Sequence, residues 1–578
     1  MIGILTFVGF TSLVGIIAYL ATRSTDETSS DGYFLGGRSL TAGVIAGSLL
    51  LTNLSTEQIV GLNGSAYKDG LSVMAWETLA AIAMVVTAVF LLPRYLKGGL
   101  TTVPQFLSDR FDVSTKTITS GLFLTGYVVV LLPVILYSGS VAISGMFNVP
   151  ELLGVSDTTA LVICIWGIGV IGSIYAVFGG LKAVAVSDSI NAIGLIAGGI
   201  LIPVFGLMAI GGGSVIEGLD TLMAANPDRF DSTGEHGQEV PFSTIFTGMM
   251  LVQLFYWGTN QQIIQRALGA KSLAEGQKGL LLASFLKILG PIILVLPGMI
   301  AYHYFEGGLA SSDLAYPELV RAVLPNYLVG FFAAVLFGAI LSSFNSVLNS
   351  SVTLFGIDIY KQHINQEASE KTVVKYGKIF GICLALAAMF IAPMIANAGS
   401  LFNYLQEING IYSIPILTII VVGYLTKRVP AIAAKIGILS GSLLYILSQF
   451  VLKPRLVEQA LAEAAASGIT DAAQLAIVEA DAYPHYLHVN AILFLLNSGI
   501  MLIIGLIYPR KEAFTLQYTQ KVDIVPYKYV KQAGISIVVV VICIYVCSAA
   551  SLKCLLDFLS MPIRLLMLSK RLVSTSCT

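Results

Sequence analysis

Long apolar segments constrain this chain more than any other feature of its sequence. A helix that crosses a bilayer needs about 20 apolar residues, because the backbone must satisfy its own hydrogen bonds there. The sequence contains 14 such segments. They cover residues 2–21, 40–66, 70–96, 117–146, 158–179, 183–211, 242–268, 273–303, 323–360, 374–395, 399–425, 430–452, 486–508 and 533–552. We therefore expect an all-α polytopic membrane protein with about 14 transmembrane helices.

The composition agrees with this fold class. Only 11% of the 578 residues are charged and the mean hydropathy is +0.84, whereas about a quarter of a soluble protein is charged. The first segment has no basic residue before it and no small-residue cleavage site after it, so we expect a retained helix rather than a signal peptide.

The basic residues predict the orientation of the chain. Of the 32 Lys and Arg residues, 22 fall at Arg94 and in the connections on one side, which are 22–39, 97–116, 180–182, 266–278, 361–378, 426–435 and 509–531. The opposite connections hold five. Because cytoplasmic loops are enriched in Lys and Arg, we expect a multi-pass protein of the plasma or inner membrane with its N-terminus outside. The acidic connections 212–241 and 453–485 would then be extracellular and solvated.

The C-terminal tail does not fit this orientation. An even number of spans leaves residues 553–578 outside, yet the tail carries four basic residues that would prefer the cytoplasm: Lys553, Arg564, Lys570 and Arg571. Residues 554–568 are therefore interpreted as a fifteenth segment, either short or interfacial.

Five charged residues lie within or beside the apolar spans: Glu57, Glu77, Asp188, Lys287 and Glu407. A charge at the centre of a membrane helix costs about 2.5 to 3.5 kcal/mol on insertion scales, so each marks a functional site unless an internal salt bridge explains it. For Glu77 and Lys287, two interpretations are equally supported: a functional site, or a salt bridge that only holds helices together. Asp188 lies near a helix end, where a side chain can also snorkel to the interface. For Glu57, the two interpretations are solvation at a helix end and a salt bridge.

Several function classes lack the residues that they need. All five histidines lie in or beside loops and no HExxH pair exists, which disfavours haem ligation, zinc hydrolysis and hence an embedded enzyme. The sequence has no ladder of arginines and no potassium-channel filter, which disfavours a channel. No feature indicates nucleic-acid binding. Of the function classes considered, a transporter is the one that the residues do not disfavour.

Polar interruptions occur in two corresponding spans. LLLTNLSTEQIVG places its polar residues at 52–58, and FYWGTNQQIIQ occupies 255–265. Transporters place their binding sites at discontinuous helices that recur in two repeats. We therefore predict five-helix repeats at 40–211 and 242–425. Residues 1–39 would form an extra helix and loop, 212–241 an extracellular loop, and 426–552 additional helices. Each interruption alone is also compatible with a polar helix interface.

A third polar feature lies in GAILSSFNSVLNSSVT. Ser342, Ser346, Asn349 and Thr353 share one helical face. Packing explains the stripe as a whole, while the Ser342–Ser343 pair is interpreted as an ion site.

Six motifs identify a family resemblance. They are DGYFLGGRSL, SLLLTNLSTEQIVGLNGSAY, FYWGTNQQIIQRALGAKSLAEGQKG, LVLPGMIAY, LSSFNSVLNSSVTLFGIDIYK and YLQEINGIYSIP. In register from about residue 30 to about residue 440, they resemble the solute:sodium symporter family, and most closely its sodium/glucose branch, which includes a bacterial sodium/galactose cotransporter. The resemblance implies a leucine-transporter-type inverted repeat that couples sodium influx to solute uptake by alternating access.

The resemblance also implies site residues. Sodium would be bound by the Ser342 and Ser343 hydroxyls and by the carbonyls of Leu51, Leu54 and Ala339, while Asp188 would lie on the sodium exit path. These neutral oxygens suit an alkali cation. The implied solute contacts are Gln58, Glu77, Gln253, Lys287 and Gln406, with Trp76 and Tyr256 as gates. Amides and an ion pair can donate and accept hydrogen bonds with sugar hydroxyls.

Four positions depart from the galactose transporter. Gln253 and Leu131 replace Asn, Trp76 replaces Tyr, and Ala80 replaces Ser. The loss of polar groups at Leu131 and Ala80 argues against galactose itself and favours a less polar sugar or sugar-like polyhydroxylated solute. The alternatives are a sodium symporter for a carboxylate, amino acid, vitamin or anion, and then a sensor or channel with the same fold.

Overall fold

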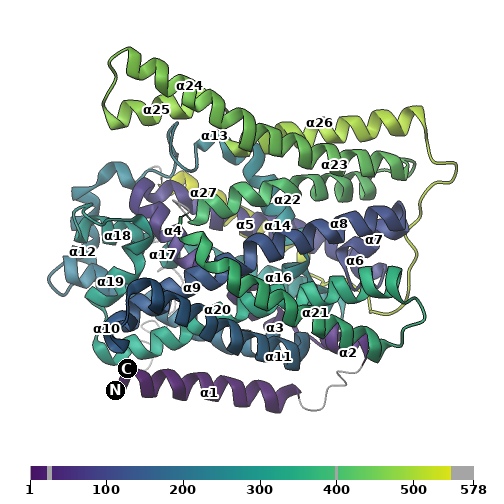
Figure 1. The fold of residues 1–578 in the computed structure, drawn as a ribbon, viewed down its shortest axis with the longest axis horizontal. Coiled ribbons are helices and arrows are strands. Elements are labelled where there is room, and N and C mark those ends of the chain that lie inside the picture. Colours follow the sequence, from purple (N-terminus) through teal and green to yellow (C-terminus); the bar gives the residue numbers. More distant parts are fainter. Residues whose placement is uncertain (1, 23–28, 398–400, 549–578) are drawn as a thin grey trace, which may run out of the picture.

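The computed structural model describes residues 2–22, 29–397 and 401–548. The regular secondary structure of this part of the chain is helical, apart from two isolated β-bridges that join Leu40 to Ala270 and Ser272 to Asp523. Most of the long helices lie along one common direction and form a bundle (Figure 1). The predicted segment at 554–568 lies outside the described residues.

Eight helices form long single elements. They are α1 (Ile2–Thr22), α11 (Asp157–Ile210), α20 (Asn326–Thr353), α21 (Glu370–Ile391), α22 (Leu401–Leu425), α23 (Ala431–Leu447), α26 (Tyr486–Ile507) and α27 (Val530–Ser548). Gly180 divides α11 into two segments, because its φ of 54° and ψ of −173° are not helical. This positive φ favours glycine, which has no Cβ to clash with the backbone.

Other predicted spans consist of several shorter helices. These pieces are α3 (Ala42–Asn53) and α4 (Thr56–Asp69), α5 (Ala75–Val86) and α6 (Leu92–Lys97), α8 (Val113–Gly126) and α9 (Leu132–Phe147), α13 (Phe242–Thr244), α14 (Met250–Gly258) and α15 (Gln261–Leu268), and α16 (Leu273–Lys287), α17 (Gly290–Leu294) and α18 (Leu296–Tyr304). One π-helical turn, Thr87–Leu91, joins α5 to α6, and another, Tyr127–Leu131, joins α8 to α9. A third, Ile245–Met249, joins α13 to α14.

The remaining helices lie in the connections. They are α2 (Ser30–Leu35), α7 (Val103–Arg110), α10 (Val149–Leu153), α12 (Val215–Ala225), α19 (Ala315–Val323), α24 (Lys453–Ala466) and α25 (Ala472–Ala482). The acidic connections 212–241 and 453–485 therefore contain helices, whereas the sequence suggested loop surface.

The predicted count of 14 spans is not confirmed. Each predicted range overlaps a helix, but the described residues contain ten helices that are long and apolar enough to cross a membrane, or 11 if the pair α16 with α17–α18, bent by 50°, is one span. Helix breaks explain much of the difference, because α3 and the pieces α14 and α15 are each too short to cross alone.

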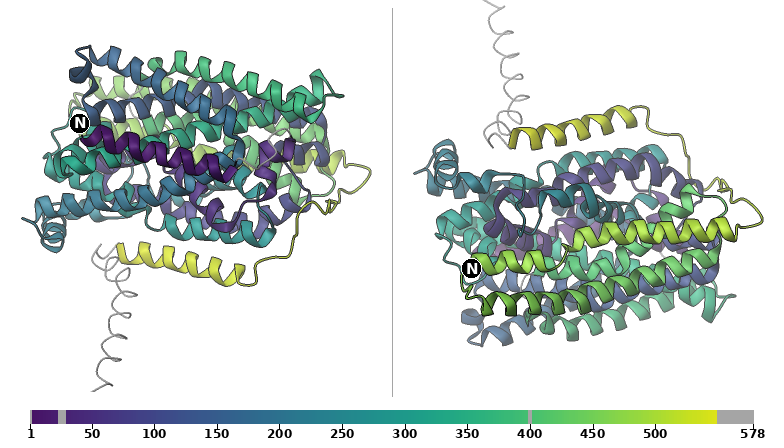
Figure 2. Two further views of the ribbon diagram at one scale, coloured as in Figure 1. Left: turned by 90° about the horizontal axis from the view of Figure 1, so that it is seen from below. Right: turned by 90° about the horizontal axis from the view of Figure 1, so that it is seen from above.

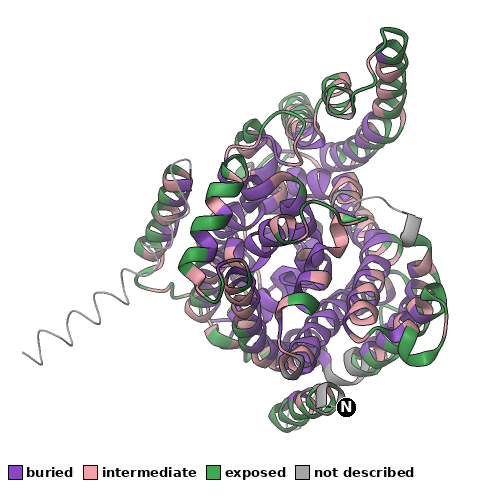
Figure 3. Ribbon diagram, turned by 90° about the vertical axis from the view of Figure 1, so that its left-hand side faces the viewer, coloured by how far each residue is buried: buried purple, intermediate pink, exposed green. Residues whose placement is uncertain are grey.

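The bundle has a buried interior and an apolar exterior. Seen along its axis, buried residues fill the centre and exposed residues lie at the periphery (Figure 3). Ile193, Phe246 and Leu506 are 73%, 75% and 81% exposed, respectively. Such large exposed apolar side chains suit contact with lipid tails. The protein is therefore a multi-pass membrane protein.

The broken helices lie among the other long helices. α3 packs against α11, α16 and α20, while α14 packs against α5 and α22. In contrast, α27 lies on the outside of the bundle (Figure 2), where it packs against α5 and α16. This arrangement puts both polar interruptions in the protein interior.

Candidate solute and sodium sites

Both polar interruptions are breaks between helices. α3 ends at Asn53, Leu54 has a non-helical ψ of 53°, and α4 begins at Thr56. In the second interruption α14 ends at Gly258, and the Asn260 side chain caps α15 by accepting a hydrogen bond from the Gln262 N–H. Helix ends leave backbone N–H and C=O groups without helical partners. The breaks therefore expose polar backbone inside an apolar bundle.

One cavity lies beside the two breaks. It holds about 590 Å³ of empty space, a volume that includes the opening to solvent. All seven residues predicted for the solute and its gates line this cavity: Gln58, Trp76, Glu77, Gln253, Tyr256, Lys287 and Gln406. The departures Ala80 and Leu131 line it as well. The seven predicted residues thus come from five different helices and converge on one space.

An ion pair forms one wall of the cavity. Glu77, in the first turn of α5, and Lys287, at the end of α16, are 0% and 1% exposed. The Lys287 ammonium pairs with Glu77 Oε2, and Gln58 Nε2 donates to Glu77 Oε1 over 3.0 Å. Both carboxylate oxygens therefore have partners, as a buried charge requires. The sequence allows a salt bridge between Glu77 and Lys287, and the structure brings these two side chains together.

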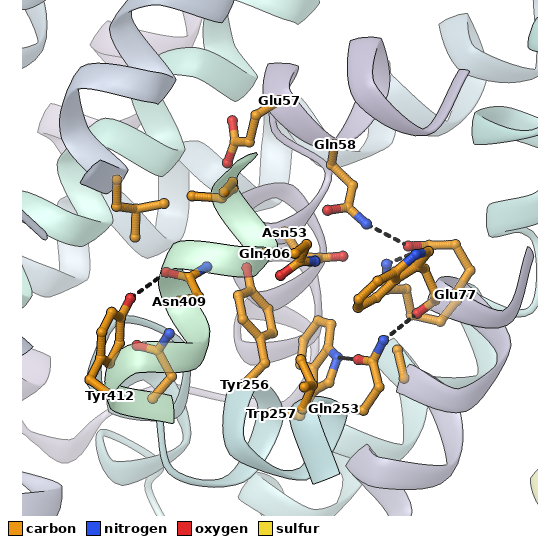
Figure 4. A pocket seen from close by; sticks show the side chains of 17 residues that line it. Asn53, Glu57, Gln58, Glu77, Gln253, Tyr256, Trp257, Gln406, Asn409 and Tyr412 are labelled. Atoms are coloured by element: carbon orange, nitrogen blue, oxygen red, sulfur yellow. Dashed lines mark hydrogen bonds and ion pairs between the residues drawn. The ribbon is translucent and has the colours of Figure 1, made fainter. Parts of the chain in front are cut away.

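Amide groups provide further polar contacts. Gln253 Nε2 donates to the Trp76 carbonyl over 2.8 Å, and Gln253 Oε1 accepts from Trp257 Nε1 over 3.2 Å. On α22, the Tyr412 hydroxyl donates to Asn409 Oδ1 over 2.5 Å. Figure 4 shows Gln58, Glu77 and Gln253 on one side of the cavity and Asn409 and Tyr412 on the other. A solute between these sides would meet hydrogen-bonding groups from both.

The structure adds lining residues that sequence reasoning missed. They are Asn53, Glu57, Val252, Trp257, Asn260, Leu405, Asn409 and Tyr412. Two signals could have identified some of them: Asn260 lies inside the second interruption, and Asn409 follows Gln406 by three residues on the same helix.

The residues predicted for sodium gather where α20 packs along α3. Leu51, Leu54, Ala339, Ser342 and Ser343 are all buried. The Ser343 hydroxyl donates to the Thr52 carbonyl over 3.0 Å, and Thr52 Oγ1 lies 3.4 Å from Ser342 Oγ. Thr52, which the sequence did not single out for sodium, therefore connects the break in α3 to the serine pair.

The other intramembrane charges have different surroundings. Asp188 is completely buried and so does not snorkel, and its Oδ2 accepts from Ser48 Oγ over 2.6 Å. Glu407 pairs with Lys453 at 2.5 Å. Glu57 has no ion-pair partner among the described residues, but it lies in the first turn of α4, where the helix dipole favours a negative charge.

Comparison with known proteins identifies the family. Residues 33–441 match the sodium:solute symporter family. The chain is 45% identical to the uncharacterized symporter YidK of Escherichia coli K12 over 94% of this chain and 90% of YidK. It is 32% identical to the sodium/glucose cotransporter of Vibrio parahaemolyticus, over 76% of this chain and 83% of that protein.

Solved structures identify the fold. A substrate-bound, outward-open Na⁺-coupled sialic acid symporter superposes with a TM-score of 0.65 at 19% identity, over 86% of this chain and 98% of that structure. The chain thus has the fold of leucine-transporter-type symporters, as its resemblance implied, and sodium is the coupled ion of its family. We conclude that the chain is a sodium-coupled membrane transporter that belongs to the sodium:solute symporter family.

Proposed function

We propose that this symporter takes up a sugar or a sugar-like polyhydroxylated solute. The observation that carries the proposal is the cavity around Glu77 and Lys287, where Gln58, Gln253 and Gln406 add amide groups. Amides both donate and accept hydrogen bonds, which suits a neutral solute with many hydroxyls. The similarity to the sodium/glucose cotransporter of Vibrio parahaemolyticus supports the same solute class.

Aromatic side chains would close the solute site. Tyr256 and Trp76 line the cavity, and each presents an apolar ring that can pack against the C–H face of a pyranose. We assign Tyr256 to the inner side and Trp76 to the outer side. Closure by these rings would exclude water and strengthen the polar contacts.

Sodium would bind at the break in α3. In this proposal the Ser342 and Ser343 hydroxyls and the carbonyls of Leu51, Leu54 and Ala339 are its ligands. Asp188 would receive the ion on its way to the cytoplasm. The contact between Ser343 and Thr52 supports this position, because it joins α20 to the broken helix.

The domain division follows from the same breaks. We propose that the repeats 40–211 and 242–425 rock against each other, with the N-terminus outside a plasma or inner membrane. The breaks between α3 and α4 and between α14 and α15 support the two repeats, since each lies near the start of its repeat.

Leu131 and Ala80 favour a less polar sugar over galactose, since both line the cavity without a hydrogen-bonding side chain. The same two positions are compatible with a second candidate substrate class, a non-sugar solute such as a carboxylate, amino acid, vitamin or anion. Lys287 does not favour an anion, because Glu77 already neutralises it.

Uptake into proteoliposomes tests the proposal. We expect one or more sugars from a panel to accumulate under an inward sodium gradient and not under an equal potassium gradient. Sodium and that sugar should each tighten the binding of the other, because coupling free energies are reciprocal. Uptake confined to a non-sugar solute would support the second candidate. A solute-gated current without accumulation would indicate a sensor or channel instead.

A further inference from the structure

A buried guanidinium lies beside the proposed sodium position. Arg266, in the last turn of α15, is 0% exposed. Its Nε donates to Ser48 Oγ over 3.0 Å, and its Nη2 donates to Ser346 Oγ and lies 4.0 Å from Asp188 Oδ2. Its Nη1 donates to the Gln262 carbonyl. The side chain thus joins α15 to α3, α11 and α20.

A short chain of hydroxyls connects Arg266 to the proposed sodium ligands. The Ser346 hydroxyl, which accepts from Arg266, lies 3.1 Å from Thr52 Oγ1. Thr52 Oγ1 in turn lies 3.4 Å from Ser342 Oγ. The hydroxyls of Ser346 and Thr52 therefore connect the positive charge of Arg266 to Ser342, which is proposed to bind sodium.

Asp188 pairs with Arg266 through a bridging hydroxyl. Ser48 donates to Asp188 Oδ2 and also accepts from Arg266, so it bridges the ion pair. The other oxygen, Oδ1, is buried and has no hydrogen-bond partner. A buried carboxylate oxygen without a partner is costly, and a sodium ion that passes this point could satisfy it.

Nearby charges would affect how strongly the proposed site holds sodium. Like charges repel strongly where water is excluded, so Arg266 opposes a sodium ion nearby while Asp188 attracts it. Paired with Arg266, Asp188 attracts sodium weakly. Without Arg266, Asp188 would act on the ion as an uncompensated negative charge.

We propose that Arg266 is a positioning residue that sets sodium affinity by holding Asp188. It keeps Oδ2 of the carboxylate paired while sodium is bound at Ser342 and Ser343, so that Oδ1 is open to the ion as the ion leaves. This inference rests on the proposed sodium site. In this role Arg266 sets the balance between tight binding of sodium and its release to the cytoplasm.

A double-mutant cycle that neutralises each charge tests this role in the full-length protein. Arg266→Gln should lower the sodium concentration for half-maximal binding about tenfold and slow sodium release, because Asp188 becomes uncompensated. Asp188→Asn should raise that concentration, because Arg266 is left unopposed. The double variant should return to within about threefold of the wild type, and Arg266→Lys, which keeps the charge, should stay close to it. Solute affinity at saturating sodium should not change.

Arg110 provides a matched control. It is also 0% exposed, and its guanidinium donates to the carbonyls of Gly423, Thr426 and Val429, away from the proposed sodium site. Arg110→Gln should lower thermal stability without changing sodium affinity. If Arg266→Gln fails to fold, the double variant is compared with Asp188→Asn instead. A higher sodium affinity in the double variant supports the role of Arg266, and an equal affinity contradicts it.

The outcomes separate this inference from the proposed site. If Ser343→Ala abolishes sodium binding while Arg266→Gln leaves it within twofold of the wild type, the sodium site stands and the role of Arg266 is wrong. If Ser343→Ala leaves sodium binding intact, the proposed site is wrong and the inference fails with it. Equal behaviour of the Lys and Gln variants would also overturn the proposal, because charge would then not matter.

Discussion

The Ser343 hydroxyl donates to the Thr52 carbonyl, 3.0 Å away, at the point where α3 is about to end. These residues are 291 positions apart in the chain. The contact joins a continuous helix, α20, to a broken one. An ion bound between them would therefore respond to movement of either helix, which alternating access requires.

Removal of the Ser343 hydroxyl should weaken sodium coupling. We expect Ser343→Ala to raise the sodium concentration for half-maximal uptake by about ten- to a hundredfold, because a contact with a charged group contributes about 1.5 to 3 kcal/mol. Sodium-gradient uptake into proteoliposomes measures this. Ser351→Ala is the control, since the Ser351 hydroxyl only bonds the Val347 carbonyl of its own helix. Equal effects of the two substitutions would contradict the proposed ligand role.

The pair Glu77–Lys287 should serve both stability and binding. Lys287→Met should destabilise the protein by about 3 to 5 kcal/mol, because it leaves the buried Glu77 carboxylate unpaired. The double variant Glu77→Gln/Lys287→Met should recover most of the thermal stability but not solute uptake. Thermal unfolding and flux, measured on the same preparations, separate the two roles. Uptake that recovers together with stability would show that the pair only locks the helices.

Leu131 and Ala80 should determine which solute is preferred. We expect the double variant Leu131→Asn/Ala80→Ser to shift uptake toward more fully hydroxylated sugars by about tenfold, because new buried polar groups need partners on the solute. Competition between sugars in a flux assay measures the shift. Ala81→Ser is the matched control, since Ala81 is buried next to Ala80 but does not line the cavity. An unchanged order of preference in the double variant would exclude these positions from specificity.

Glu239 should make stability depend on pH. Burial raises the pKa of Glu239 to about 8 from 4.5, and the nearby Asp69 carboxylate adds to this shift. The folded protein therefore keeps a proton that the unfolded chain releases. Stability should fall as the pH rises from about 4.5 to about 8, and remain low above that.

Substitution of Glu239 isolates this effect. Glu239→Gln should flatten the pH dependence of Tm and make the protein more stable than the wild type at pH 9, on the order of 2 kcal/mol. The exposed Glu235, four residues earlier in the same loop, supplies the control substitution Glu235→Gln. A wild-type pH profile in the Glu239→Gln variant would rule out the carboxyl as the titrating group.

The sequence predicted the helix breaks well, because they are local. Polar residues at 52–58 and 255–265 interrupt apolar runs, and the structure breaks the helices at Leu54 and at Thr259 and Asn260. The seven solute and gate residues also line one cavity, as the resemblance implied. Their roles and the repeat boundaries stay predictions. The number of spans was harder to predict, because hydropathy does not show where one span divides into two short helices.

The sequence by itself determined that the chain is helical and lies in a membrane, because hydropathy and helical periodicity are local properties that the bilayer imposes on each segment. Only the tertiary structure decided which buried polar and charged groups meet. Glu77 finds Lys287 at a separation of 210 residues, and Arg266 reaches Ser48 at 218. These pairs depend on how distant helices pack, and packing follows from the shapes of all the contacting side chains together. No single segment encodes it.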